Sequence, residues 1–415
     1  MRLLHTSDWH LGQTLHDFDR TAEHRHFLDW LAVTLQEQEV DALLISGDVF
    51  DTANPPAASQ ALLYRFLREA RARVPHLAIV IIAGNHDSPS RLEAPAPLLQ
   101  AFDASIVGQA RRGADGEVDP ASLVVPLKAK DGKIAARCLA VPYLRPGDVP
   151  RVDTEGDAFA AGVAELYQRA SAHARSLREP GQAIVAMGHC HMSGGQVSKL
   201  SERRIVVGGA EALPASLFEP DIAYVALGHL HLAQPVGGRD AMRYAGSPLP
   251  MSFSEADYPR QVLCVDLDGA ALGAVRSVPV PRFLELLRVP GDAPASAAEV
   301  LEALRSLELP DLPRDEQPLL QVRVRLDAPE PGLRATVEAA LAGKPVRLAR
   351  IETSYPARAT DGATAEAEVL EDLGRLAPED IFRRLYQRQY QQPPPAVLLS
   401  AFGELLHDPG AEDAA

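Results

Sequence analysis

The first 231 residues repeatedly place side chains of metal-ligand type just after short apolar segments. The full set is Asp8, His10, Asp48, Asn85, His86, Asp87, His189, His229 and His231. Carboxylate, imidazole and amide groups together suit manganese, iron or zinc. Two such ions about 3.5–4 Å apart hold a phosphate for in-line displacement at phosphorus. A single histidine after a strand is more often structural, so the prediction of a two-metal site depends on the coincidence of five clusters.

The elements that must position these side chains alternate along the chain. Short apolar runs typical of buried strands cover residues 2–7, 42–46, 77–83, 183–187 and 222–227. Amphipathic helices are predicted over residues 21–38, 57–72 and 158–176. Hairpins are predicted over 122–141 and 261–280, with turns at Asp131-Gly132 and Asp268-Gly269. We therefore expect an α/β domain, a β-sheet core flanked by helices, in which the strand ends of an open sheet meet in one crevice.

The sequence divides into four expected parts. Residues 1–280 carry the candidate metal ligands, and residues 281–356 are predicted to form a small α+β domain that begins at a proline-rich joint. In that small domain Ser296 and Glu299 have the spacing of a capping box. Residues 357–376 are typical of a linker, and residues 377–415 of a helical tail. The tail helix predicted over 378–392 carries an apolar stripe made of Ile381, Phe382, Leu385, Tyr386 and Tyr390.

Composition limits the classes of function. The 415 residues carry a net charge of −15, which argues against a stand-alone, high-affinity binder of nucleic acid. An enzyme that acts on phosphates remains compatible, because bound metal ions add positive charge. Apolar runs are too short for a membrane helix, and no secretory signal pattern is present at the first residues, so we expect a cytoplasmic protein without membrane partners. The three cysteines show no spacing of a disulfide framework or zinc knuckle.

The clusters also resemble the motifs of a known family, the calcineurin-like metallophosphoesterases. The matching motifs are Asp8-x-His10, Gly47-Asp48-x-x-Asp51, Gly84-Asn85-His86-Asp87, Gly188-His189 and Gly228-His229-x-His231. The longer strings at residues 5–12, 46–52 and 244–253 are similar to those of the bacterial double-strand-break repair nucleases. This resemblance covers essentially the whole chain in order, including a capping domain and a helical tail.

The resemblance implies a role for each residue. One ion is expected on Asp8, His10 and His231, the second on Asn85, His189 and His229, with Asp48 bridging both. The ions would be two Mn²⁺, with Mg²⁺ or another divalent ion possible. His86 would face the scissile phosphate, and Asp87 would orient His86. Some relatives have a histidine where this chain has Asp51, so no second catalytic histidine is assigned.

The resemblance also implies a function and partners. We expect ATP-dependent exonuclease action on double-stranded DNA ends, and endonuclease action on single strands and hairpins, in DNA repair, recombination and replication. An SMC-family ATPase would bind the tail, the capping domain would select DNA shape, and a homodimer would form within a heterotetramer near the nucleoid. One alternative is a metallophosphoesterase of small phosphodiesters or phosphoproteins. Another is a metal-binding scaffold without catalysis.

Several other polar residues are expected to have ordinary structural roles. Trp9 is expected in the core beneath the ligands, and Cys190 as a small buried residue. His24 and His26 are expected on the solvated face of their helix. His191 is expected to support the site or the fold rather than to bind metal. The basic groups at 111–112, 128–133 and 199–204 have either a phosphate-binding or a merely solubilising role.

Overall fold

Strand β4 (Ala42–Ser46) is apolar along nearly its whole length because it is covered on both faces. All five of its residues are buried. Leu43 and Ile45 pack in one hydrophobic cluster with helices α1 (Thr21–Glu37) and α2 (Ala57–Arg73). Leu44 packs in a different cluster, with strands of a second sheet. Successive side chains of a strand point to opposite faces, so β4 lies between a layer of helices and another sheet.

Two six-stranded sheets make up the core of the domain that carries the candidate ligands. The first has the order β14-β13-β1-β4-β5-β6 and the second the order β11-β12-β10-β9-β8-β7. The strands of the first are β1 (Arg2–Thr6), β4, β5 (Ala78–Ile82), β6 (Ala104–Val107), β13 (Gln261–Asp268) and β14 (Ala271–Pro279). Those of the second are β7 (Val124–Lys128), β8 (Ile134–Ala140), β9 (Ala183–His189), β10 (Ile222–Gly228), β11 (Gln234–Val236) and β12 (Arg239–Tyr244).

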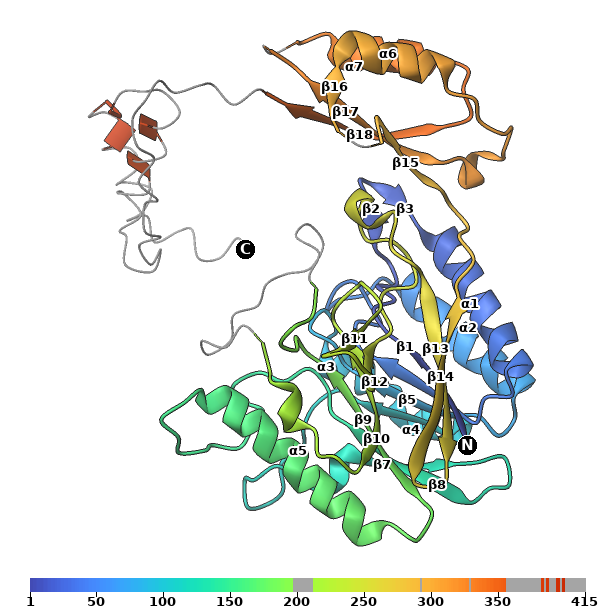
Figure 1. Ribbon diagram of the computed structural model, residues 1–415, viewed down its shortest axis with the longest axis vertical. Coiled ribbons are helices and arrows are strands. Elements are labelled where there is room, and N and C mark those ends of the chain that lie inside the picture. The colour runs from blue at the N-terminus through green and yellow to red at the C-terminus, as the bar shows by residue number, and fades with distance from the viewer. Residues whose placement is uncertain are drawn as a thin grey trace. The chain divides into compact units, whose positions relative to one another are not determined.

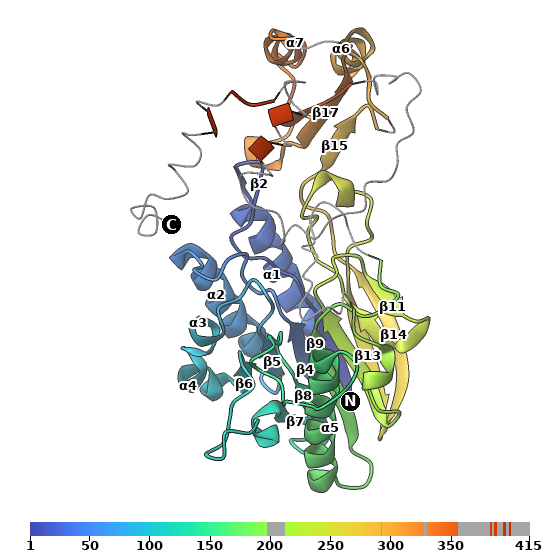
Figure 2. The same cartoon turned by 90° about the vertical axis from the view of Figure 1, so that its left-hand side faces the viewer.

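Helices cover the outer faces of both sheets, which gives four layers. Helices α1 and α2 lie against the first sheet, and α5 (Ala158–Leu177) against the second, as Figures 1 and 2 show. Val163 and Leu166 of α5 belong to the cluster that also contains Leu44, so this core extends through the second sheet. Among the shorter elements, α3 (Pro89–Glu93), α4 (Ala96–Leu99) and the 3₁₀ turn η1 (Gln100–Phe102) lie beside β6 of the first sheet. The strands β2 (Thr14–Leu15) and β3 (Phe18–Asp19) form a separate two-stranded sheet.

The expectation of a single open sheet is wrong, although the α/β class is confirmed. A strand that faces a helix layer on one side and a second sheet on the other is as apolar as a strand between two helix layers. The alternation of strands and helices therefore did not distinguish one sheet from two. Both predicted hairpins are confirmed at sheet edges, since β7 pairs antiparallel with β8 and β13 pairs antiparallel with β14.

The segment predicted to form a small α+β domain contains both strands and helices. Its four strands are β15 (Leu286–Val289), β16 (Ala295–Ser296), β17 (Leu319–Arg325) and β18 (Arg347–Ser354), and the other three all pair parallel with β17. Helices α6 (Ala297–Ser306) and α7 (Leu333–Ala340) share one hydrophobic cluster with this sheet. The capping box is present, because the Ser296 side chain accepts from the N–H of Glu299 while the Glu299 carboxylate accepts from the N–H of Ser296.

The computed structural model describes residues 1–196, 212–291, 293–327 and 330–355, with residues 382–383, 386–387, 393–395 and 398–399 of the tail. Residues 1–356 form one compact unit and residues 357–415 a second. Most of the tail helix predicted over 378–392 lies outside the described residues. Within them, the rings of Phe382 and Tyr386 lie 6.0 Å apart, as expected one helical turn apart.

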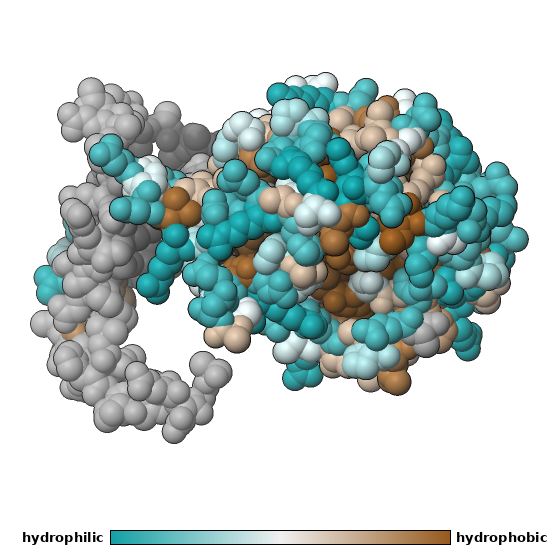
Figure 3. Space-filling model, turned by 90° about the horizontal axis from the view of Figure 1, so that it is seen from below, coloured by the Kyte–Doolittle hydropathy of each residue, from teal (hydrophilic) through white to brown (hydrophobic). Residues whose placement is uncertain are grey.

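The helices and one face of the surface can be compared with the expectation that the chain has no membrane-spanning helix. Across the described part of the chain, no helix is both long and apolar enough to span a bilayer. On the face drawn in Figure 3, hydrophilic residues surround small groups of hydrophobic ones. Leu98 is the most exposed of the large apolar side chains in the described residues, at 75% of its surface, and Phe102 nearby is 37% exposed.

Gly228 lies where β10 closely approaches the end of β4, and it gives a test of the two-sheet core. A Cβ atom on Gly228 would lie 1.9 Å from the carbonyl oxygen of Ser46 at the end of β4. We therefore expect Gly228→Ala to destabilise the fold by about 3 kcal/mol, as overpacking does. Gly147→Ala is the matched control, since nothing lies within 4 Å of its added Cβ. Urea unfolding of both variants measures the difference, and similar midpoints would contradict this packing.

Candidate metal centre

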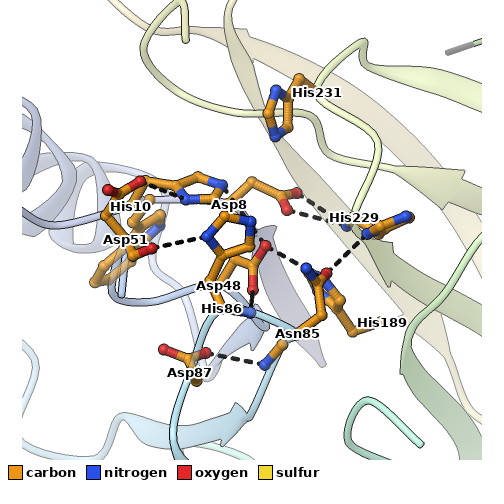
Figure 4. Close-up of polar contacts among 12 residues, drawn as sticks. Asp8, His10, Asp48, Asp51, Asn85, His86, Asp87, His189, His229 and His231 are labelled. Atoms are coloured by element: carbon orange, nitrogen blue, oxygen red, sulfur yellow. Dashed lines mark hydrogen bonds and ion pairs between the residues drawn. The ribbon is translucent and has the colours of Figure 1, made fainter. Parts of the chain in front are cut away.

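Five strand ends bring the predicted ligands to one place, at the junction of the two sheets. Figure 4 shows side chains from both sheets gathered around Asp48. Strands β1, β4 and β5 run parallel in the first sheet, and β9 and β10 run parallel in the second, so each set ends at a common edge. Three groups of ligand atoms lie within 4.8 Å of one another, namely Asp8 with His10 and His231, His10 with Asp48 and His86, and Asp8 with Asp48 and His189.

The backbone around these residues is unusual, because four of them, including His229 with a φ of 101°, have φ angles in the left-handed region. The φ angles of Asp8, His10 and Asp48 are 55°, 46° and 48°. Two hydrogen bonds hold them, from Asp8 N to the carbonyl of Gly47 and from His10 N to the carbonyl of Asp48, each 3.0 Å. Gly47 has a φ of 87°, and a Cβ there would lie 2.3 Å from Nδ1 of His189. These hydrogen bonds and close contacts hold the loops against one another, and they fix the directions in which the ligand side chains point.

Two histidines direct ring nitrogens at one amide oxygen. The Nδ1–H of His189 donates to the carbonyl of Ser46 over 2.8 Å, so in the neutral ring Nε2 carries the lone pair. That Nε2 lies 3.0 Å from Oδ1 of Asn85 and 3.4 Å from Oδ2 of Asp48. Nδ1 of His229 lies 3.0 Å from the same Asn85 oxygen. Imidazole, carboxylate and amide groups that converge in this way form a ligand set that suits a divalent cation.

The other two histidines are oriented by carboxylates. Nδ1 of His231 lies 2.9 Å from Oε1 of Glu255, and Nδ1 of His10 lies 3.3 Å from Oδ1 of Asp51. A carboxylate behind an imidazole is the usual support of a metal-binding histidine. His10 is buried, yet neither of its ring nitrogens makes a hydrogen bond of good geometry. An ion would satisfy this otherwise orphaned polar group, so the residues fit a divalent metal centre.

Charge in the centre favours a cation as well. Burial alone would raise the pKa of Asp48, but His189, His10 and His86 hold it well below its usual range. Burial lowers the pKa of His189, but Asp48 and Asp8 outweigh burial and raise it to about 9. The buried carboxylates therefore attract positive charge strongly to the position of His189, either as a proton or as a metal ion.

His86 lies beside the ligand cluster and is only partly buried. Its backbone N–H donates to Oδ1 of Asp48 over 2.8 Å, which joins its loop to the cluster. Its Nδ1 lies 2.7 Å from the carbonyl oxygen of Asp51. A carbonyl only accepts, so Nδ1 carries a proton and Nε2 is the nitrogen left for substrate. The ring meets that of His10 edge to face, with 4.8 Å between centroids.

Asp87 makes its hydrogen bonds to backbone groups, and within the described residues none of them reaches the His86 ring, so the role of Asp87 in orienting His86 stays a prediction. The buried Asp87 carboxylate accepts from the backbone N–H groups of Gly84, Val49 and Phe50, at 2.9, 3.1 and 2.9 Å. It therefore fastens the loop after β4 to the loop after β5. Burial and the nearby charge of Asp48 raise its pKa to about 6. The side chain turns inward because unpaired backbone N–H groups in a buried loop need an acceptor.

The remaining expectations can be compared with the structure directly. Trp9 is fully buried and meets Phe27 and Phe66 edge to face, which confirms its core role. His24 is buried rather than solvated, with Nε2 3.1 Å from the carbonyl of Trp9, so that expectation is wrong. The helix turns this position inward beneath the ligand loop. His26 is exposed, as expected.

Two supporting residues were missed at the level of sequence. Glu255 lies two residues beyond the last matching string and has no family motif around it, so nothing in the sequence pointed to it. Asp51 belongs to a matching motif but received no role. Its position three residues after Asp48 was the available signal, since that spacing keeps it in the same short loop.

Comparisons with known proteins agree with this geometry. Residues 1–233 match the family model described as calcineurin-like phosphoesterase, and residues 282–390 match the model described as type 5 capsule protein repressor C-terminal domain, SbcD_C. These matches confirm the α/β metallophosphoesterase class and the resemblance seen in the motifs.

Curated relatives match over most of their length. The SbcD subunit of the nuclease SbcCD from Rhodobacter capsulatus is 41% identical over 92% of this chain and 93% of its own. The protein of the same name from Escherichia coli K12 is 32% identical over 98% of both chains. That from Bacillus subtilis is 37% identical over 64% of this chain and 66% of its own. The chain therefore belongs to the calcineurin-like phosphoesterases and, within them, to the SbcD family of SbcCD nuclease subunits.

Proposed function

We propose that this chain is a metal-dependent DNA nuclease that hydrolyses phosphodiester bonds as the SbcD-type subunit of an SbcCD-like complex. The convergence of five histidines, two aspartates and an asparagine at one sheet junction carries the proposal, together with the near full-length relatives named as nuclease subunits. In this complex it would act as an ATP-dependent exonuclease on double-stranded ends and as an endonuclease on single strands and hairpins.

We assign the ligands to two ions, preferably Mn²⁺, with Mg²⁺ or another divalent ion possible. Asp8, His10 and His231 would hold one ion, and Asn85, His189 and His229 the other, with Asp48 between them. The ligand groups around Asp8 and Asp48 and the shared Asn85 oxygen support this division. When bound, two ions supply positive charge that offsets the charge developing on the phosphate and favours ionisation of the attacking water.

The protein's own residues would then orient the reaction. The carbonyl of Asp51 fixes the tautomer of His86, so that Nε2 faces the phosphate and donates a proton to the leaving oxygen when the ring is protonated. Asp87 would act indirectly, by holding the loop that carries Asn85 and His86 against the loop that carries Asp48.

The partners are proposed from the family to which the chain belongs. The tail at residues 377–415 would bind an SbcC-like SMC-family ATPase, after a linker at 357–376, and the domain at 281–356 would cap the catalytic domain at 1–280 and select DNA shape. A homodimer within a heterotetramer is proposed on the same family resemblance. We place the complex in the cytoplasm, at the nucleoid.

Hydrolysis of small phosphodiesters or phosphoproteins is not favoured as the natural activity. The family model of residues 282–390 belongs to a second region that a small-molecule enzyme would not need. Comparing manganese-dependent degradation of linear duplex DNA with and without the ATPase partner tests the proposal. Degradation only of small phosphodiesters under both conditions would refute it.

Asp48 provides the first test of the metal assignment. Asp48→Asn should weaken both ion sites, because the bridging position serves both, whereas His10→Ala should empty mainly one. Elemental analysis and calorimetry give the manganese stoichiometry. Asp29→Asn is the control, since the Asp29 side chain is 60% exposed and pairs with Arg65 on the helix surface. Two full sites in Asp48→Asn would refute the bridging role.

His86 should be separable from the ligands by substitution. His86→Gln should retain the wild-type manganese content but lower turnover by roughly 10²–10⁴-fold, the usual contribution of a positioned acid or base. Turnover and metal content are measured on the same preparation. Loss of manganese in this variant would instead make His86 a ligand.

The tail should be needed for the partner and not for chemistry. Replacing Phe382 and Tyr386 together by serine should abolish co-purification with the SbcC-like ATPase while leaving manganese-dependent cleavage of a generic phosphodiester unchanged. Tyr355→Ser is the matched control, an aromatic residue with 52% of its surface exposed outside the tail. Retained co-purification of the double variant would place the interface elsewhere.

A further inference from the structure

The segment that follows β8 borders the metal centre although it supplies none of the proposed ligands. Strand β8 pairs parallel with β9, with Ala140 opposite Met187, so both strands end at the same edge of the sheet. Strand β9 ends at His189. Beyond β8, the N–H of Tyr143 donates to the carbonyl of Ala83 over 2.8 Å. This hydrogen bond ties the segment to the loop that carries Asn85.

Two side chains of this segment contact each other on its accessible side. Leu144 is buried in the core between the sheets and anchors the segment. Its neighbours differ, since Tyr143 is partly buried and Arg145 is exposed. The Arg145 guanidinium lies over the Tyr143 ring, 5.6 Å from its centroid. The N–H of Arg145 donates to Oδ2 of Asp148 over 2.8 Å, which fixes the turn that presents it.

Tyr143 connects this pair to the metal centre. Its ring meets the ring of His189 edge to face, with 6.3 Å between centroids and 78° between planes. From the metal centre outward, the proposed ligand His189 is therefore followed by the Tyr143 ring and then by the positively charged guanidinium of Arg145. Inside the centre the buried carboxylates of Asp8 and Asp48 carry negative charge, so a phosphate outside the reach of the ions needs a cation of its own.

We infer that Arg145 and Tyr143 form a backbone subsite for single-stranded DNA beside the scissile phosphate. Arg145 binds the neighbouring phosphate, for which a guanidinium has matching geometry. Tyr143 holds the guanidinium in place and offers its ring to the adjoining nucleoside, as aromatic residues do in single-strand binding sites. This inference rests on the proposed nuclease function and adds to it how the substrate is positioned.

A substrate with one phosphate reaches only the reaction centre, whereas a substrate with many phosphates also reaches the subsite. Comparing the effect of a substitution on both substrates therefore distinguishes the two sites. The full-length chain with Mn²⁺ is tested on a fluorescent single-stranded oligonucleotide and on bis(4-nitrophenyl) phosphate. Arg145→Gln should raise KM for the oligonucleotide about tenfold, the scale of one charge-assisted hydrogen bond, with kcat nearly unchanged. Hydrolysis of the small ester should be unaffected. Tyr143→Ala should also raise KM for the oligonucleotide, and Tyr143→Phe, which keeps the ring against His189, should retain the wild-type KM.

Arg65→Gln is the matched control, because Arg65 is a surface arginine on α2 that pairs with Asp29 and its replacement removes the same charge. Oligonucleotide binding is also measured by fluorescence anisotropy across a salt series, with Ca²⁺ in place of Mn²⁺. Arg145→Gln should reduce the salt slope of log K by about 0.7, the value for one phosphate contact on a single strand, and Arg65→Gln should not.

The outcomes distinguish the subsite from the proposed function. Equal KM and equal salt slopes for Arg145→Gln and Arg65→Gln would overturn the subsite. An equal loss on both substrates would also overturn it, because Arg145 would then support the metal centre itself. A wild-type chain that binds the oligonucleotide but cleaves neither substrate would refute the nuclease proposal, while the anisotropy comparison would still decide the subsite.

Discussion

The close approach of β4 to β9 and β10 determines where every other part of the centre lies. At the end of β4, the carbonyl of Ser46 accepts the Nδ1–H of His189, and its hydroxyl donates to the carbonyl of Ala226 over 3.1 Å. Only glycine fits at position 228 beside them. Held at this distance, loops from two different sheets reach the same small volume. A shift of about 1 Å between the sheets would separate side chains that we propose to share an ion.

The loops are fixed by the chain itself, which has an energetic consequence. Left-handed backbone at Asp8, His10 and Asp48 costs on the order of 1–3 kcal/mol per residue. Hydrogen bonds between the loops offset this cost, including the N–H of His229 to Oδ1 of Asp8 at 3.0 Å. The Asp87 carboxylate adds three more by holding backbone N–H groups. The centre is therefore preorganised by protein contacts, and an ion would enter a geometry that is already formed.

The local parts of this structure could be predicted from sequence, and the long-range parts could not. Strand β4 has the predicted bounds because a run of apolar residues between turn residues depends only on its own neighbourhood. The five polar clusters stood out for the same reason. The second sheet was missed, since burial against a sheet or a helix gives the same apolar pattern. The partners of Asp87 and the role of Glu255 were missed because they depend on which backbone groups and rings the fold brings near.

The separation of Asp8 and His229 along the chain also determines when the centre can form during translation. Their contact spans 221 residues. A ribosome that adds about 5–20 residues per second needs roughly 10–45 s to cover that interval. During this time the first carboxylate has emerged while the last two histidines have not yet been synthesised. Nascent chains thus carry only fragments of the centre, and cleavage competence arises late in synthesis, after the strands of both sheets have left the ribosome.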